Sequence, residues 1–173
     1  MTKLKLWVLW LLWPSYVKGG NQHSLLVVLK CWFFQKVIRI NSHVPWPVHP
    51  TSKVIRPEYI SRGTRAPGLG ICSYIDGRNG ITFGENVWLG PRVSVISMNH
   101  DTCCYDEYEV VEPITIGRDS LLCVNSVVLP SVRLGPHTIV AAGSVVTKSF
   151  PEGNQVLAGV PAIVVKKLGP YWS

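Results

Sequence analysis

Apolar residues recur at every sixth position through the middle of this 173-residue chain. Small or β-branched residues stand four positions after most of them, and glycine directly follows several. A period of six matches neither the 3.6-residue turn of an α-helix nor the two-residue alternation of a strand. It is typical of a short strand plus a tight turn, with three such units in each coil of about 18 residues. The in-phase apolar positions are Phe83, Leu89, Val95, Ile116, Leu122, Val128, Leu134, Val140 and Val146.

This period predicts a parallel β-helix, an all-β solenoid. Each in-phase side chain is expected to point into the core and to stack on its counterpart one coil away. Projected towards the N-terminus, the same phase places Ile71 in the core. Seven tryptophans and a charged fraction of only 16% fit a folded chain rather than a disordered one. No apolar run reaches the roughly 18 residues of a spanning helix, which argues against a membrane channel.

The phase is interrupted once, between Val95 and Ile116, which are 21 positions apart, three more than one full coil. The interrupting segment 98–113 is polar and carries five acidic residues. Loops on a rigid scaffold are common places for binding and catalysis. His100, at the root of this segment, is the only histidine of residues 50–135. Because imidazole transfers protons readily near neutral pH, we interpret the segment as an active loop.

Charge divides the chain into two parts. Residues 1–62 hold nine Lys/Arg and one acidic residue, whereas residues 63–173 hold eight Lys/Arg and nine Asp/Glu. The basic residues of the first part are scattered among Leu, Val and Trp and form no cluster, which argues against a nucleic-acid partner. Basic residues interleaved with large apolar ones suit an anionic membrane surface or an anionic lipid-linked substrate.

Two apolar stretches lie in the basic part. Residues 4–13 resemble a signal peptide superficially, but no small-x-small cleavage pattern follows Pro14, so we expect the stretch to be retained. Residues 25–40 are predicted to form a helix of about four turns. Two roles remain open for this appendage. It could pack on the body or a sister subunit, or residues 1–40 could contact the inner face of the cytoplasmic membrane peripherally.

The expected domain organisation has three parts. Residues 1–62 form the basic, Trp-rich appendage, which ends in a rigid extended linker over 44–57 because its four prolines exclude a helix. Residues 63–150 form the β-helix with its active loop, and residues 151–173 close it. The five cysteines include no CxxC pair, so we expect free thiols in a reducing cytoplasm.

Several segments of the repeat region resemble the left-handed β-helix acyltransferases with hexapeptide repeats. The resemblance spans about residues 45–168 and is closest to the sugar O-acetyltransferases of capsule and exopolysaccharide clusters. It extends to the maltose, galactoside and nodulation acetyltransferases. It implies a left-handed coil, a homotrimer, and acetyl-CoA as co-substrate without a metal. The matching segments are GITFGENVWLGPRVSVIS (80–97), NHD (99–101), PITIG (113–117), LGPHTIVAAGSVVTKSFPEG (134–153) and AGVPA (158–162).

The resemblance also implies catalytic residues in the loop. His100 is expected to be the general base that takes a proton from the acceptor hydroxyl as this hydroxyl attacks the thioester. Asp101 is expected to orient the imidazole or bind the acceptor, although a role as turn former remains open.

The coenzyme-binding residues implied by the resemblance lie near the end of the repeats. The backbone of Ala142 and Gly143 is expected to contact the pantetheine arm in a groove between the coils of two subunits. Thr147 and Lys148 follow at the end of the coil. Lys148 and Lys166 match positions where basic side chains meet the coenzyme phosphates.

The predicted function is an acetyl-CoA-dependent O-acetyltransferase of a sugar hydroxyl, in capsule or exopolysaccharide biosynthesis. Serine and antibiotic O-acetyltransferases share this chemistry and remain open. A trimeric β-helix that binds without catalysing is the main alternative outside it. Zinc-dependent hydration fits poorly, because the body offers only His100 and His137 for a site that needs three histidines.

Overall fold

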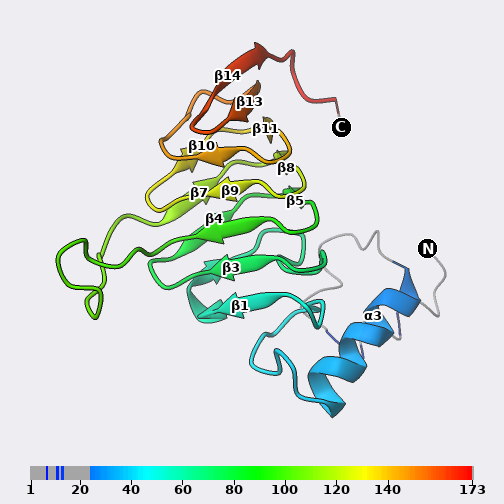
Figure 1. The fold of residues 1–173 in the computed structure, drawn as a ribbon. Coiled ribbons are helices and arrows are strands. Elements are labelled where there is room, and N and C mark those ends of the chain that lie inside the picture. Colours follow the sequence, from blue (N-terminus) through cyan, green and yellow to red (C-terminus); the bar gives the residue numbers. More distant parts are fainter. Residues whose placement is uncertain (1–6, 8–10, 12, 14–23, 173) are drawn as a thin grey trace.

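The computed structural model describes residues 7, 11, 13 and 24–172, which include a solenoid with a helix at one end and a hairpin at the other (Figure 1). Most of the apolar stretch predicted over residues 4–13 lies outside the described residues, which include only Trp7, Leu11 and Trp13 of it. In the described part of the chain, no helix is long and apolar enough to cross a membrane.

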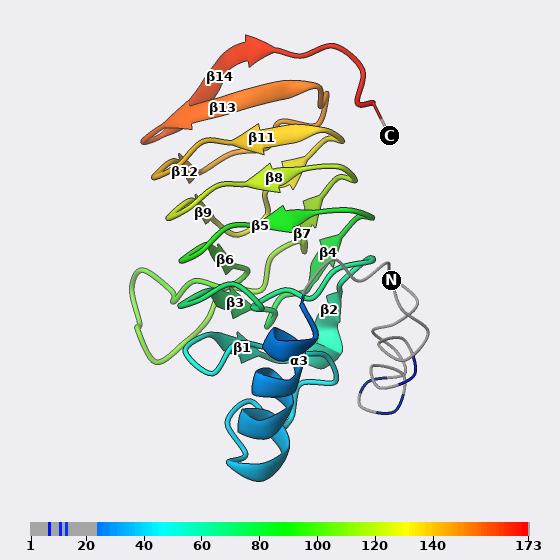
Figure 2. The same cartoon turned by 90° about the vertical axis from the view of Figure 1, so that its right-hand side faces the viewer.

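The strands form three sheets, one along each side of the coil (Figure 2). Sheet A has the order β1-β3-β6-β9-β12, sheet B the order β10-β7-β4-β2, and sheet C the order β14-β13-β11-β8-β5. Neighbouring strands pair in parallel, except β13 and β14, which form an antiparallel hairpin. The strands are β1 Lys53–Ile55, β2 Ile60–Ser61, β3 Tyr74–Asp76, β4 Ile81–Phe83, β5 Trp88–Leu89, β6 Ser94–Ile96, β7 Ile114–Ile116, β8 Leu121–Leu122, β9 Val127–Val128, β10 Arg133–Leu134, β11 Thr138–Val140, β12 Val145–Val146, β13 Gln155–Gly159 and β14 Ala162–Lys167.

The predicted period of six forms the core, and the predicted parallel β-helix is confirmed. Leu122 pairs with Val140 and Val128 with Val146 in neighbouring coils, and all four side chains are fully buried. Each such burial is worth about 1.5–3 kcal/mol. The prediction for Ile71 is wrong. Its side chain is 46% exposed, because the chain is still turning there and enters sheet A only three residues later.

The turns between sheets explain the glycine that follows several core positions. An added Cβ on Gly135 would lie 2.3 Å from the carbonyl oxygen of Pro151 in the next coil, so only glycine lets the two backbones approach this closely. Other turns use residues with a left-handed backbone, among them Asn86, Asp119 and Asn125 with φ of 55° to 58°. Asn and Asp tolerate this conformation better than most side chains.

The interruption of the period is a loop between β6 and β7, as predicted, but its length differs from the prediction. Phe83 pairs with Ile116 across it, 33 positions along the chain, whereas counterparts in the following coils are 18 apart. The loop therefore adds 15 residues to its coil rather than three. The sequence count was wrong because it assigned a full coil to the interruption, whereas the chain advances by only one side of the coil across it.

A helix covers the N-terminal end of the solenoid, below β1 in Figure 2. α3 (Leu25–Trp32) begins at Ser24, whose hydroxyl accepts a hydrogen bond from the Val27 amide, and continues into the π-helical turn η1 (Phe33–Val37). It is thus shorter than the helix predicted over 25–40. A second short element, η2 (Pro57–Tyr59), is a 3-10 turn between β1 and β2.

The cysteines are all free thiols, as expected from their spacing. Cys31 lies on the buried side of α3, and this burial raises the pKa of its thiol to about 11. Cys72, Cys103 and Cys104 are exposed.

Candidate active site

The candidate active site lies where the chain passes from sheet A to sheet B, which we call the A–B edge. In each coil a short turn makes this passage, and in the coil of β6 and β7 the loop 98–113 replaces it. The loop projects from the solenoid as the long excursion between β6 and β7 (Figures 1 and 2). The loop sequence contains five acidic residues and no lysine or arginine.

His100 lies exposed at the start of this loop, with a defined imidazole orientation. Its Nδ1 is 2.5 Å from the carbonyl oxygen of Tyr105. Because a carbonyl oxygen can only accept, Nδ1 must donate the hydrogen. In the neutral ring Nε2 then carries the lone pair. The Tyr108 ring packs beside the imidazole with centroids 4.6 Å apart, and the two residues form a β-bridge across the loop.

Asp101 shapes the loop through its carboxylate. Oδ1 accepts hydrogen bonds from the backbone amides of Cys103 and Cys104, at 2.7 and 2.9 Å. The Asp101 amide in turn donates to the Glu107 carbonyl at 3.0 Å. The group that holds the His100 imidazole is therefore the Tyr105 carbonyl, and the turn role left open for Asp101 has direct hydrogen-bond support.

The preceding coil holds both ends of the loop in place. The Asn79 side-chain amide donates to the carbonyls of Ser97 and Glu109, at 3.0 and 2.8 Å. Beside it, the fully buried Asp76 carboxylate binds Arg78 with an N–O distance of 2.7 Å. The hydrogen bond to Asp76 raises the pKa of Arg78 above its usual range, and the guanidinium lies 5.0 Å from the Tyr108 ring centroid.

Sequence reasoning missed these supporting residues. Asp76, Arg78 and Asn79 are distant from His100 in sequence and reach the loop only because one coil stacks on the next. Only the six-residue period could have indicated them, because it places residues 77–80 in a passage from sheet A to sheet B, one coil before the loop.

Two hollows accompany the A–B edge, one on each side of the loop along the solenoid. The first, of about 420 Å³, lies between the loop and the coils before it. The second, of about 320 Å³, lies at the last coil and the C-terminal hairpin. Tyr59, Arg78, Asn79, Gly80, Val110, Val111 and Pro113 line the first, and Lys148, Ser149, Phe150, Pro151, Glu152, Gln155 and Val164 line the second.

The structure brings only some of the predicted coenzyme residues to this edge. Thr147 and Lys148 lie exposed on the A–B edge, with the Lys148 ammonium 5.7 Å from the Phe150 ring centroid. Lys166 is exposed on β14, opposite Val156.

Ala142 and Gly143 lie elsewhere, in the turn between β11 and β12 where the chain passes from sheet C to sheet A. Both are exposed, Gly143 has φ of +70°, and the space beside its Cα is open. Within one chain, this C–A edge and the His100 loop stand at opposite ends of the sheet A strands.

The repeats match a known sequence family. The family described as "Bacterial transferase hexapeptide (six repeats)" matches residues 113–148, directly after the loop. Residues 113–148 of the chain thus carry hexapeptide repeats of this family. The predicted resemblance to this family is thereby confirmed.

Proteins named as acetyltransferases are similar to this chain over part of their length. A Schizosaccharomyces pombe protein named "Putative acetyltransferase" is 33% identical over 100 residues, which are 56% of this chain and 47% of the relative. The chain thus spans about half the length of this curated relative. The structure of a maltose O-acetyltransferase from Clostridium difficile is 28% identical, with a TM-score of 0.51, over 57% of this chain and 54% of the other.

A hexapeptide-repeat acetyltransferase from Vibrio cholerae, solved with acetyl coenzyme A, is 26% identical with a TM-score of 0.52. The match covers 69% of each chain. A galactoside acetyltransferase in complex with coenzyme A shares the fold over 91% of both chains, at 20% identity and a TM-score of 0.57.

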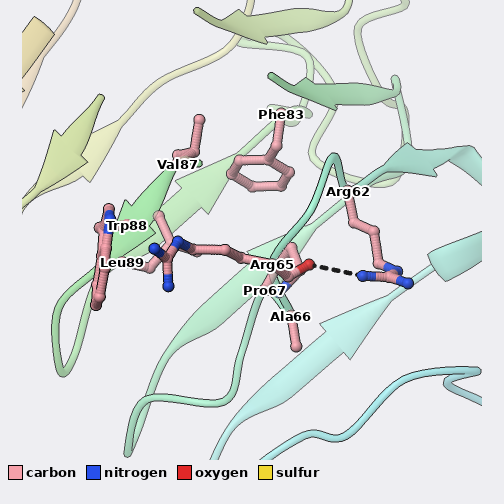
Figure 3. A pocket seen from close by; sticks show the side chains of 8 residues that line it. All are labelled: Arg62, Arg65, Ala66, Pro67, Phe83, Val87, Trp88 and Leu89. Carbon is pink, nitrogen blue, oxygen red and sulfur yellow. Dashed lines mark hydrogen bonds between the residues drawn. The ribbon is translucent and has the colours of Figure 1, made fainter. Parts of the chain in front are cut away.

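A further small hollow on this hexapeptide-repeat solenoid lies away from the His100 loop, beside the start of β5 (Figure 3). The Arg65 guanidinium stacks there 3.3 Å from the Trp88 ring centroid and donates a hydrogen bond to Asn86 Oδ1 at 2.7 Å. The Arg65 side chain therefore occupies most of this hollow. Among the described residues, no three His, Cys, Asp or Glu side chains are grouped as a metal site would require.

Proposed function

We propose that this hexapeptide-repeat protein is an acetyl-CoA-dependent O-acetyltransferase that acts on a sugar hydroxyl in capsule or exopolysaccharide biosynthesis in the cytoplasm. The observation that carries the proposal is the imidazole of His100. Its Nδ1 is bonded to a carbonyl oxygen, so its Nε2 lone pair is available in an exposed loop between two hollows. The similarity to acetyltransferases of known structure supports the reaction class.

The proposed reaction needs no covalent enzyme intermediate. Nε2 of His100 accepts the proton of the acceptor hydroxyl while the hydroxyl oxygen forms a bond to the thioester carbonyl carbon. The carbon–sulfur bond then breaks, and the coenzyme A sulfur leaves with the proton returned from the imidazolium. The Tyr105 carbonyl stabilises the imidazolium, because it accepts the Nδ1 hydrogen throughout.

The two hollows suit the two substrates. Lys148 lies in the hollow nearer the C-terminal hairpin, where a cation would meet the coenzyme phosphates. The hollow below the loop combines the aromatic ring of Tyr59 with the polar side chains of Arg78 and Asn79, a combination suited to a sugar. We therefore assign the coenzyme to the hollow at the C-terminal hairpin and the acceptor to the hollow between the loop and the coils before it.

The separation of the predicted coenzyme residues supports a homotrimer. Ala142 and Gly143 stand at the C–A edge, and His100 stands at the A–B edge of the same chain. A pantetheine arm that contacts both edges needs a second copy, whose C–A edge lies beside the A–B edge of the first. The coenzyme site is then completed only by assembly.

Calorimetric titration with coenzyme A and acetyl-CoA tests the proposal. We expect one saturable site per chain. Lys148→Ala is expected to weaken binding about tenfold, because it removes a charge-assisted hydrogen bond to a phosphate. Lys53→Ala is the matched control, since Lys53 is also an exposed lysine but lies on β1, and this variant should bind coenzyme A normally.

Two results would contradict the proposal. Absence of saturable binding at millimolar coenzyme A would favour a non-catalytic trimeric scaffold. Coenzyme binding followed by transfer to serine or an aminoglycoside, and to no sugar in the same acceptor panel, would assign the protein to another O-acetyltransferase class.

A further inference from the structure

The helix at the base of the solenoid is apolar on two faces. One face packs on the body, where Val28, Cys31 and Gln35 are buried. A helix that is apolar all round normally has all of its sides covered. Among the described residues, the solenoid body covers only one side of α3, and the other side is left for a partner.

The exposed side carries large apolar side chains spaced three or four residues apart along the segment. Leu26 is 79% exposed, Leu29 38%, Phe33 46% and Val37 53%, and Ile40, which follows the helical segment, is 39% exposed. Large apolar side chains scattered singly on a surface are ordinary, but five within residues 26–40 mark an interaction surface. We call these five residues the apolar stripe.

Basic side chains flank the apolar stripe. Lys30 and Lys36 are exposed on the same helical segment, and Arg39 is exposed just after it. Residues 1–57 contain eight Lys/Arg and no Asp or Glu. The partner must therefore combine an apolar layer with negative charge.

We propose that the apolar stripe and its flanking cations dock this protein on an anionic lipid surface. The helix would lie in the plane of the interface, with Leu26, Phe33 and Val37 in the acyl boundary and the lysines at the headgroups. α3 stands at the end of the solenoid opposite the C-terminal hairpin (Figure 1), so it can meet a surface without hindrance from the stacked coils. Docking is independent of the acetyl transfer proposed above.

A second copy of the chain is the competing occupant of the stripe. Self-association through this face would bring two clusters of like charge together, since no acidic residue of the segment is present to pair with them. An anionic lipid surface neutralises the same charges. The electrostatic argument therefore favours lipid.

Co-sedimentation of the full chain with vesicles tests the proposal. The vesicles contain equal parts of phosphatidylglycerol and phosphatidylcholine, and vesicles of phosphatidylcholine alone serve as the neutral comparison. We expect binding to the anionic vesicles, weakened by salt. Lys30→Gln with Lys36→Gln should lower the partition coefficient about 25-fold, at about fivefold for each charge near the surface.

Leu26→Ser with Val37→Ser should lower the partition coefficient at least about tenfold, because two apolar side chains no longer enter the bilayer. The matched controls lie on the solenoid: Arg92→Gln with Arg118→Gln removes the same charge, and Val160→Ser with Val165→Ser removes exposed apolar groups from the far hairpin. Both controls should bind as the native chain does.

Three outcomes would overturn the proposal. The native chain could fail to bind anionic vesicles, the solenoid controls could lose as much binding as the helix variants, or the stripe variants could change only the oligomeric state. The last would assign the stripe to a second copy of the chain. A coenzyme A titration of the same preparations shows whether the acetyltransferase proposal stands or fails separately.

Discussion

Replacement of His100 by alanine is expected to lower turnover about 100- to 10,000-fold, the usual contribution of a positioned general base. The imidazole is exposed on a loop outside the stacked core, so its removal should leave the thermal midpoint unchanged. Coenzyme A affinity should also stay within about twofold, because the proposed phosphate contacts lie at the last coil. The loss should therefore appear in kcat with an intact, coenzyme-binding protein.

His137→Ala is the matched control for this experiment. His137 is the other histidine of the solenoid body, and its Nδ1 lies 3.0 Å from Asn154 Oδ1 in the turn between sheets B and C. This turn is away from the His100 loop, so the variant should keep its full turnover. An unchanged rate for His100→Ala, measured with the acceptor that the native chain uses, would show that another group takes the proton.

The core of this fold was predictable because a solenoid repeats its local environment. Each in-phase residue stacks on an in-phase residue of the coil before it and of the coil after it. Leu122, for example, pairs with Leu89 on one side and with Val140 on the other. The six-residue pattern predicts burial less well at positions where a sheet begins. Ile71 follows the phase but lies in a turn before β3, and Leu89 is only half-buried on β5.

The site was predictable only in part, for a related reason. His100 and its loop break the period and so stand out in the sequence. Asn79 and Asp76 do not stand out in the sequence. Asn79 reaches the loop only once the coils stack, and Asp76 reaches Arg78 only once the turn between them forms. The sequence likewise left two roles open for Asp101, and the hydrogen bonds to Cys103 and Cys104 appear only in the folded loop.

Gln35 is the clearest case of a polar residue whose role the sequence conceals. Its helical position suggests a solvated side chain, yet it is 1% exposed beneath the first coil. Its Nε2 donates to the Trp46 carbonyl at 3.0 Å, and its Oε1 accepts from the Val48 amide at 2.8 Å. Further contacts to the carbonyls of Asn41 and Val44 lie at 3.2 and 3.4 Å. One side-chain amide thus contacts four backbone groups of residues 41–48.

Gln35→Met is expected to lower the free energy of unfolding by about 2–6 kcal/mol. Methionine has a similar length but leaves the Val48 amide and the Trp46 carbonyl buried without partners, and each such group costs about 1–3 kcal/mol. Thermal or urea unfolding at matched protein concentration measures the change.

Lys36→Met is the control for Gln35→Met. Lys36 is the next residue on η1 and is exposed, so the change should stay within about 0.5 kcal/mol of the native stability. Equal stability of the two variants would mean that the proline-rich segment does not need Gln35. A large loss confined to Gln35→Met would show that a buried amide holds α3 to the first coil, and that the exposed face of the helix is available for docking because its other face is fixed.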